Sequence, residues 1–278
     1  MSQVLSEPMR RGRRAPSEAA SDDLQASIGG GRSNWLWLVE IARWERALDL
    51  GSSAVPQTAG LAEHFTSVHC LRRDRWPLGA SWTELTAEGY ANVAPVCAAP
   101  VELPYRDAAF DCVAVDDVCA GALARGAGVA FPAIRNPLLQ ECRRILRPGG
   151  CLYVGIASGR WWGHAADPAD RLGTVASTSP AARATRRRGS HGPRGKNIKS
   201  FRGLAHHLRR AGFSRVRAYC VEPSYEQPLC VIPLDRRAIL AYESWGREVS
   251  SRGRLRRSLA WLGLGGVLYP SLIYLAYA

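Results

Sequence analysis

Residues Ala47 to Phe65 read ALDLGSSAVPQTAGLAEHF, which predicts a buried strand, a tight turn and a helix in succession. The apolar strand ends at Asp49-Leu50-Gly51, and LAEHF belongs to the helix. In α/β folds that bind nucleotides, such a turn is rich in glycine because the backbone must approach the ligand closely. Here Gly51 is the only glycine of the turn, and Ser52 and Ser53 follow it.

Apolar and amphipathic stretches alternate on both sides of this turn. The expected strands are SVHCL (67–71), NVAPVC (92–97), FDCVAVDDV (110–118), CLYVGIAS (151–158) and SRVRAYCVEP (214–223). The expected helices are NWLWLVEIARWER (34–46), LLQECRRILRPGG (138–150), which ends at its Pro-Gly-Gly, and SFRGLAHHLRRAGF (200–213). Strands that alternate with helices at this spacing predict a doubly wound, parallel sheet.

The last stretch of the sequence, SLAWLGLGGVLYPSLIYLAYA (258–278), carries no charged residue. About twenty apolar residues are enough to span a bilayer, so a membrane span is one interpretation. The Gly-Leu-Gly-Gly and Tyr-Pro interruptions instead favour a short helix, a turn and a buried final strand over 269–278. We expect the strand, with the membrane span as the alternative.

The chain has 37 basic and 24 acidic residues, a net charge of +13. This excess indicates an anionic partner, such as nucleic acid, a membrane surface or a phosphorylated substrate. Nearly all the basic residues are arginine, since Lys196 and Lys199 are the only lysines. The same excess therefore also fits a compositional bias of a GC-rich genome.

The eight cysteines are scattered and form no Cys-x-x-Cys pair, so we expect reduced core thiols and no metal site. Residues 1–32 have no apolar core region, which predicts a disordered tail rather than a secretory signal, and a cytoplasmic protein. Residues 33–278 are expected to form one domain. Within it, residues 160–199 are rich in Gly, Ser, Pro and Arg and predict a mobile basic insertion.

No acidic residue occurs between Asp170 and Glu222, whereas arginines crowd this segment. It is interpreted either as a lid that binds an anionic small molecule or as a solvated loop. Aromatic residues are not interleaved with the arginines, so nucleic acid is not the expected partner. A peripheral contact with a membrane surface stays open on charge alone.

Four segments in this order resemble the class I S-adenosylmethionine-dependent methyltransferases of the broad type 11 group. They are ALDLGS, ELPYRDAAFDCVAVDDV, LLQECRRILRPGGCLYVGI and HHLRRAGFSRVRAY. PSYEQPLCVIPLD, after the sixth expected strand, looks like the extension of a subgroup with additions on the substrate side. The resemblance implies a Rossmann-like α/β sheet of seven strands, mostly parallel and with an antiparallel last strand.

The resemblance implies S-adenosylmethionine as the cofactor and assigns residues to it. The turn of Asp49, Gly51, Ser52 and Ser53 would meet the methionine end. An acid at the tip of the second strand would accept hydrogen bonds from the ribose hydroxyls. Alignment of VHCLR with that strand puts Arg72 where this acid belongs.

The resemblance also places the adenine and the reacting groups. Ala99, followed by Pro100, aligns with the position of the acid that receives the adenine amino group. Asp116 and Asp117 close the fourth expected strand, near the place where methyl group and acceptor would meet. They are the candidate catalytic residues, since a base is needed for some O and N acceptors.

Two functions from different classes follow. The first is a methyltransferase acting on a small molecule or on a precursor of a cell-surface component or secondary metabolite. The second is a catalytically inactive protein of the same fold that serves as a binding or partner subunit. The intact sheet pattern and Asp49-Leu50-Gly51 favour the first, and the departures at Arg72 and Ala99 favour the second.

Overall fold

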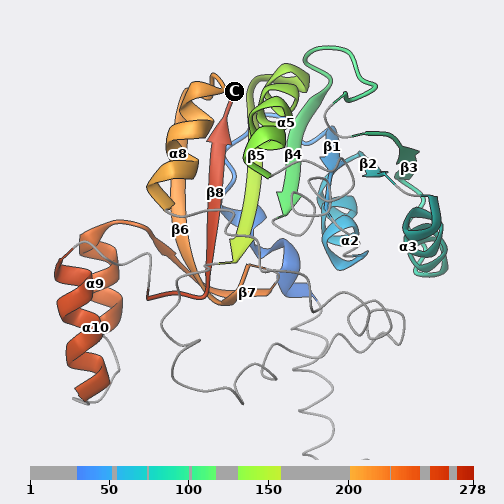
Figure 1. Cartoon of the computed structure of the whole chain (residues 1–278). Coiled ribbons are helices and arrows are strands. Elements are labelled where there is room, and N and C mark those ends of the chain that lie inside the picture. Colours follow the sequence, from blue (N-terminus) through green and yellow to red (C-terminus); the bar gives the residue numbers. More distant parts are fainter. Residues whose placement is uncertain are drawn as a thin grey trace, which may run out of the picture.

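The computed structural model describes residues 30–51, 55–73, 75–99, 102–116, 131–157, 201–225, 227–244, 251–262 and 268–278. They form one eight-stranded sheet with the strand order β3-β2-β1-β4-β5-β8-β6-β7 (Figure 1). The strands are β1 (Arg46–Asp49), β2 (Ser67–Arg72), β3 (Val93–Cys97), β4 (Phe110–Asp116), β5 (Leu146–Ala157), β6 (Arg215–Ser224), β7 (Gln227–Pro233) and β8 (Ser271–Tyr277). The tail and the basic insertion expected from the sequence lie outside the described residues, except for 30–32.

The sheet has the predicted class, mostly parallel with an antiparallel last strand. Strands β1 to β5 are parallel, and β8 runs antiparallel to both β5 and β6. The expected number of seven strands is wrong, because Gln227–Pro233 pairs antiparallel with β6 as an additional edge strand. Pro228 and Pro233 obscured β7 in the sequence, since proline cannot donate to a sheet and is tolerated mainly at its edges.

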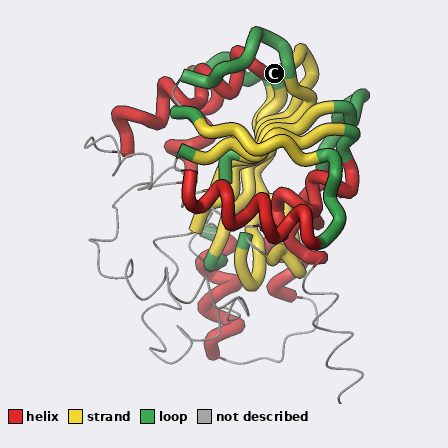
Figure 2. The backbone as a smooth tube through the Cα atoms, turned by 90° about the vertical axis from the view of Figure 1, so that its right-hand side faces the viewer, coloured by secondary structure: helices red, strands yellow, loops and turns green. Residues whose placement is uncertain are grey.

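Helices cover both faces of the twisted sheet (Figure 2). They are the 3₁₀ helix η1 (Gly30–Leu38) and the α-helices α2 (Val55–His64), α3 (Arg75–Ala87), α5 (Phe131–Ile145), α8 (Phe201–Arg210), α9 (Arg236–Ser244) and α10 (Ser251–Trp261). Alternate residues of β4 face opposite sides: Val113 and Val115 belong to the core under α5 and α8. Cys112 and Ala114 belong to the core under η1, α2 and α3. The chain thus builds two apolar layers on one sheet.

Two predicted boundaries differ from the structure. The helix expected over 34–46 is the shorter η1, and β1 begins at Arg46. The carboxylate of Asp111 accepts hydrogen bonds from the backbone N–H groups of Glu45 and Arg46, which holds this segment against the sheet instead. Strand β5 begins at Leu146, directly after α5, so the Pro-Gly-Gly at 148–150 lies within the strand.

Strand β8 confirms the buried final strand predicted from the sequence. All seven of its residues are buried, and it forms hydrogen-bonded ladders with β5 on one side and β6 on the other. It therefore joins the parallel half of the sheet to the β6–β7 hairpin. Among the described residues, no helix is long and apolar enough to cross a bilayer.

Truncation of β8 should destabilise the whole domain. We expect Ile273→Ala, at a fully buried position, to lower the free energy of unfolding by about 2–5 kcal/mol through lost contacts and a residual cavity. The matched control is Leu229→Ala on β7, where the side chain is exposed and the loss should stay below about 0.5 kcal/mol. Urea unfolding of both variants measures the difference, and equal losses would contradict a central role for β8.

Candidate functional site

The candidate site lies at the carboxyl ends of β1 and β4. The chain proceeds from β1 to β2 and β3 in one direction across the sheet, whereas β4 and β5 lie on the other side of β1. This reversal is the topological switch point, where open α/β sheets bind ligands. Asp49 ends β1 and Asp116 ends β4, so the structure brings both residues to this edge.

The carboxylate of Asp49 organises the turn after β1. It is fully buried and accepts a hydrogen bond from the backbone N–H of Gly51, with N to Oδ1 at 2.8 Å. From α2, the Gln57 amide donates to Oδ1 at 3.0 Å, and the Thr58 hydroxyl donates to Oδ2. These bonds fix the turn at Gly51 and the first turn of α2 to the end of β1.

Arg72 provides the remaining partner of this carboxylate. Its side chain turns back from the end of β2, so that the NH2 nitrogen lies 3.0 Å from Oδ2 of Asp49. The NH1 nitrogen donates to the backbone carbonyls of Asp49, at 3.1 Å, and Leu71, at 3.0 Å. With 5% of Arg72 exposed, this is a buried ion pair that covers the end of β1.

The thiol of Cys70, which lies beside this ion pair, is not reactive. Asp49 lies opposite Cys70 in the register of β1 and β2, and burial raises the pKa of the Cys70 thiol to about 11. The thiol is therefore protonated at neutral pH and does not act as a nucleophile. The ion pair can therefore hold a ligand in place through its charges, but neither it nor Cys70 supplies a nucleophile.

The residues that should meet the ribose and adenine do not fit them. A guanidinium has five donors and no acceptor, so Arg72 cannot accept hydrogen bonds from ribose hydroxyls. Ala99, after β3, is exposed and has no polar side-chain atom. At the position that the resemblance gives to the methionine end, the described residues keep the expected Asp49 and Gly51, joined by the hydrogen bond from the Gly51 N–H.

Several predicted site residues cannot be placed. Ser52, Ser53, Pro100 and Asp117 lie outside the described residues. For Asp116 the structure gives a position in the sheet, opposite Gly155 of β5. The structure thus brings together Asp49, Gly51 and Arg72, which the sequence had assigned to one pocket.

Sequence reasoning missed Gln57 and Thr58. Both are buried polar residues in the first turns of α2, and both donate to Asp49. Their signal was present as a Gln-Thr pair in a helix start that is otherwise apolar, since buried polar side chains require partners. Within the described ranges, no group of acidic, histidine and cysteine side chains could hold a metal ion.

A cavity of about 310 Å³ opens at the opposite, amino edge of the sheet. It is lined in part by Asp111 and Arg147, whose carboxylate and guanidinium are 2.7 Å apart. Arg147 also pairs with Glu45, and this hydrogen bond lowers the pKa of the Glu45 carboxyl. Ligands of open α/β sheets bind at the carboxyl edge, so we interpret this cluster as structural.

Comparison with known proteins found similarity in sequence to one family model and similarity in fold to solved structures. Residues 48–154 match the family model described as a methyltransferase domain. No curated protein matches the chain. Among solved structures, a possible exported protein from Bordetella parapertussis is similar at a TM-score of 0.51 and 12% identity, over 98% of this chain and 76% of that one. This likeness supports the fold.

Two further solved structures have lower TM-scores. An S-adenosylmethionine-dependent methyltransferase from Aquifex aeolicus has a TM-score of 0.48 at 15% identity, over 75% of this chain and 93% of that one. A possible histamine N-methyltransferase from Thermotoga maritima has a TM-score of 0.49 at 13% identity, over 94% of this chain and 95% of that one.

The buried ion pair should make a large contribution to stability. We expect Arg72→Met to lower the free energy of unfolding by about 3–5 kcal/mol, because the charge of Asp49 would stay buried without its cation. Adding Asp49→Asn should restore part of this loss, since no uncompensated charge then remains. Chemical denaturation of the single and double variants measures both effects.

The control is Arg217→Met, which removes an arginine from an exposed pair with Glu40. Solvent screens that pair, so the free energy of unfolding should hardly change. If Arg72→Met were as harmless as Arg217→Met, the ion pair with Asp49 would not exist in solution.

Proposed function

We propose that this chain, whose residues 48–154 match the family model described as a methyltransferase domain, is an S-adenosylmethionine-dependent methyltransferase with an altered cofactor pocket. The cofactor, when bound, supplies a methyl group on a sulfonium cation. Its binding place is the carboxyl edge of β1 and β4. We place the methionine end at the turn of Asp49 and Gly51, and the weakly held adenosine end beside Arg72.

The observation that carries this proposal is the hydrogen bonding of Asp49. Its carboxylate accepts hydrogen bonds from the N–H of Gly51 and from two side chains of α2, which ties the end of β1 to the start of α2. The first N–H groups of a helix have no partner within the helix, and the positive end of the helix dipole lies there, so the start of α2 can favour an anion. A carboxylate of the ligand is favoured in such a place.

For the acceptor we propose a small molecule, of the kind found as a precursor of a cell-surface component or secondary metabolite. The net charge of +13 favours an anionic acceptor. Asp116 and Asp117 stay the proposed catalytic candidates, because β4 ends beside β1, at the edge where the cofactor would lie. Ser52, Ser53 and Pro100 stay proposed cofactor contacts.

A second function, a binding or partner subunit without catalysis, is favoured by Arg72. An arginine that replaces the ribose-binding acid removes a charge-assisted hydrogen bond of about 1.5–3 kcal/mol. In addition, the guanidinium is committed to Asp49 and two backbone carbonyls. A chain with this arrangement keeps the fold of the family while it binds the cofactor feebly.

Titration with S-adenosylhomocysteine separates the two functions. We expect the wild-type chain to bind it with a dissociation constant of about 0.1–1 mM. In an Asp49→Asn background, which avoids two buried carboxylates side by side, Arg72→Asp should tighten binding at least about tenfold, because it returns a carboxylate to the ribose position. Arg72→Gln in the same background, the matched control, removes the cation without adding an acid and should give no such gain.

Calorimetry at low temperature, on variants whose circular dichroism is native, provides the measurement. The gain of Arg72→Asp should vanish with an analogue that lacks the ribose hydroxyls. If neither the wild-type chain nor Arg72→Asp binds S-adenosylhomocysteine at millimolar concentration, the methyltransferase proposal fails and the partner subunit stands.

A further inference from the structure

Helices α9 and α10 form a pair that projects from one end of the sheet (Figure 1). They follow β7 in the chain, and Tyr269 then leads into β8. Their buried contacts reach Glu222, near the carboxyl end of β6. Since β5 and β6 are both antiparallel to β8, β6 runs in the same direction as β1 to β5. The pair therefore lies at the edge of the sheet that holds the carboxyl ends of β1 to β6.

The inner face of α10 is fixed by a buried ionic network. The guanidinium of Arg256 donates to both oxygens of Glu243 on α9, over distances of 2.7–3.0 Å. The hydroxyl of Tyr269 donates to the same carboxylate at 3.0 Å. Glu243 is fully buried, and Arg256 also reaches Glu222 at 3.3 Å. These bonds set which side of α10 faces the protein.

The opposite side of α10 is apolar and exposed. Leu255 is 49% exposed, Trp261 is 61% exposed and Leu262, at the end of the helix, is 62% exposed. Leu255 and Leu262 are seven residues apart, and the exposed Ser258 lies three residues before Trp261 and four before Leu262. Residues at these spacings share one face of a helix. We call Leu255, Trp261 and Leu262 the outer face of α10. Large apolar side chains gathered on an exposed face mark an interaction surface.

Two arginines at the start of α9 provide positive charge near this outer face. The guanidinium of Arg236, on α9, lies over the ring of Trp261 with 4.9 Å to its centroid. Arg237, next to it, is exposed, and Arg252 and Arg254 precede Leu255 in the sequence of α10. Glu243, the one acidic residue of α9, is buried in the network with Arg256, so its charge is compensated. Asp235, just before α9, caps that helix through the N–H of Ala238.

We propose that the outer face of α10 docks on an anionic lipid surface. Tryptophan and leucine on one side of a helix, flanked by arginine, are what an interfacial helix needs. Trp261, Leu255 and Leu262 enter the boundary between headgroups and acyl chains, and Arg236 and Arg237 meet lipid phosphates. The net charge of +13 strengthens the attraction. This proposal does not depend on methyltransferase activity.

Flotation of the full chain with vesicles tests the proposal. One set contains phosphatidylcholine alone, and the other contains about one-third phosphatidylglycerol, which gives an anionic surface. The wild-type chain should partition at least about tenfold more strongly to the anionic set at about 0.1 M salt, where charges are only partly screened. Trp261→Ser combined with Leu262→Ser should reduce that partitioning by about tenfold, by removing buried apolar area.

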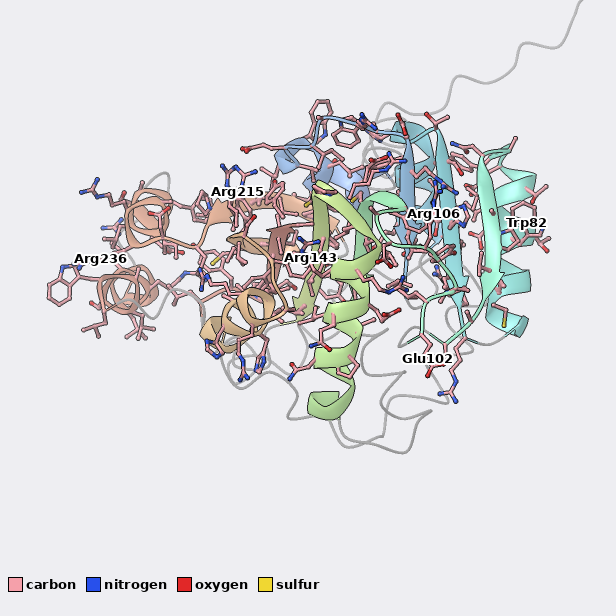
Figure 3. All side chains as sticks on the ribbon, turned by 90° about the horizontal axis from the view of Figure 1, so that it is seen from above. Trp82, Glu102, Arg106, Arg143, Arg215 and Arg236 are labelled. Atoms are coloured by element: carbon pink, nitrogen blue, oxygen red, sulfur yellow. The ribbon has the colours of Figure 1, made fainter. Side chains whose placement is uncertain are left out.

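Trp82 on α3, at the other end of the sheet from Arg236 (Figure 3), is partly buried and packs against the core, so the matched control is Trp37→Ser on η1, where the tryptophan is 83% exposed. It should leave partitioning unchanged, whereas Arg236→Glu with Arg237→Glu should weaken it. Equal partitioning of the wild-type chain and the Trp261/Leu262 variant would overturn the proposal, since total charge alone would then explain binding. A wild-type dimer that this variant converts to a monomer, without vesicle binding, would identify a second copy of the chain as the occupant and also overturn it.

Discussion

The carboxylate of Asp49 is the constraint on which the candidate site depends. It joins three parts of the molecule: the turn at Gly51, the start of α2 through Gln57 and Thr58, and the end of β2 through Arg72. A fully buried carboxylate is tolerated only where donors and a cation compensate it. Arg72 is that cation. In the proposed pocket, the residue aligned with the ribose-binding acid therefore also stabilises the turn at Gly51, so that the two proposed ends cannot be altered independently.

Most of the fold could be predicted from local patterns. The strand at 110–118 and the final strand at 269–278 were evident from apolar runs, and the structure has them as β4 and β8. Strand β7 was missed because Pro228 and Pro233 contradict the usual strand pattern, and only pairing with β6 makes it a strand. Likewise, η1 is shorter than its periodicity suggested, because Asp111, distant in sequence, binds the backbone at Glu45 and Arg46. These misses arise from contacts between segments far apart in the chain.

The candidate site, like the fold, could be predicted only in part. The resemblance to the methyltransferases assigned Asp49, Gly51 and Arg72 to one cofactor site, and in the structure hydrogen bonds of Asp49 join these three residues. The direction of the Arg72 side chain was not predictable, because it depends on the register of β1 and β2, which sets Asp49 opposite Cys70. Nor did periodicity reveal that Gln57 and Thr58 point toward Asp49, since the partner of a buried polar residue is a tertiary fact.

The position of β8 has a consequence for the order of folding. In the chain it follows every other described strand, yet in the sheet it lies between β5 and β6. While the protein is being synthesised, β1 to β5 can pair with one another, but the free edge of β5 and the β6–β7 hairpin must wait for β8. Unpaired strand edges are sites of intermolecular association, and pairing across long sequence separations is slow. The nascent chain is therefore most exposed to aggregation during the interval between synthesis of β5 and synthesis of β8, when it would most need a chaperone.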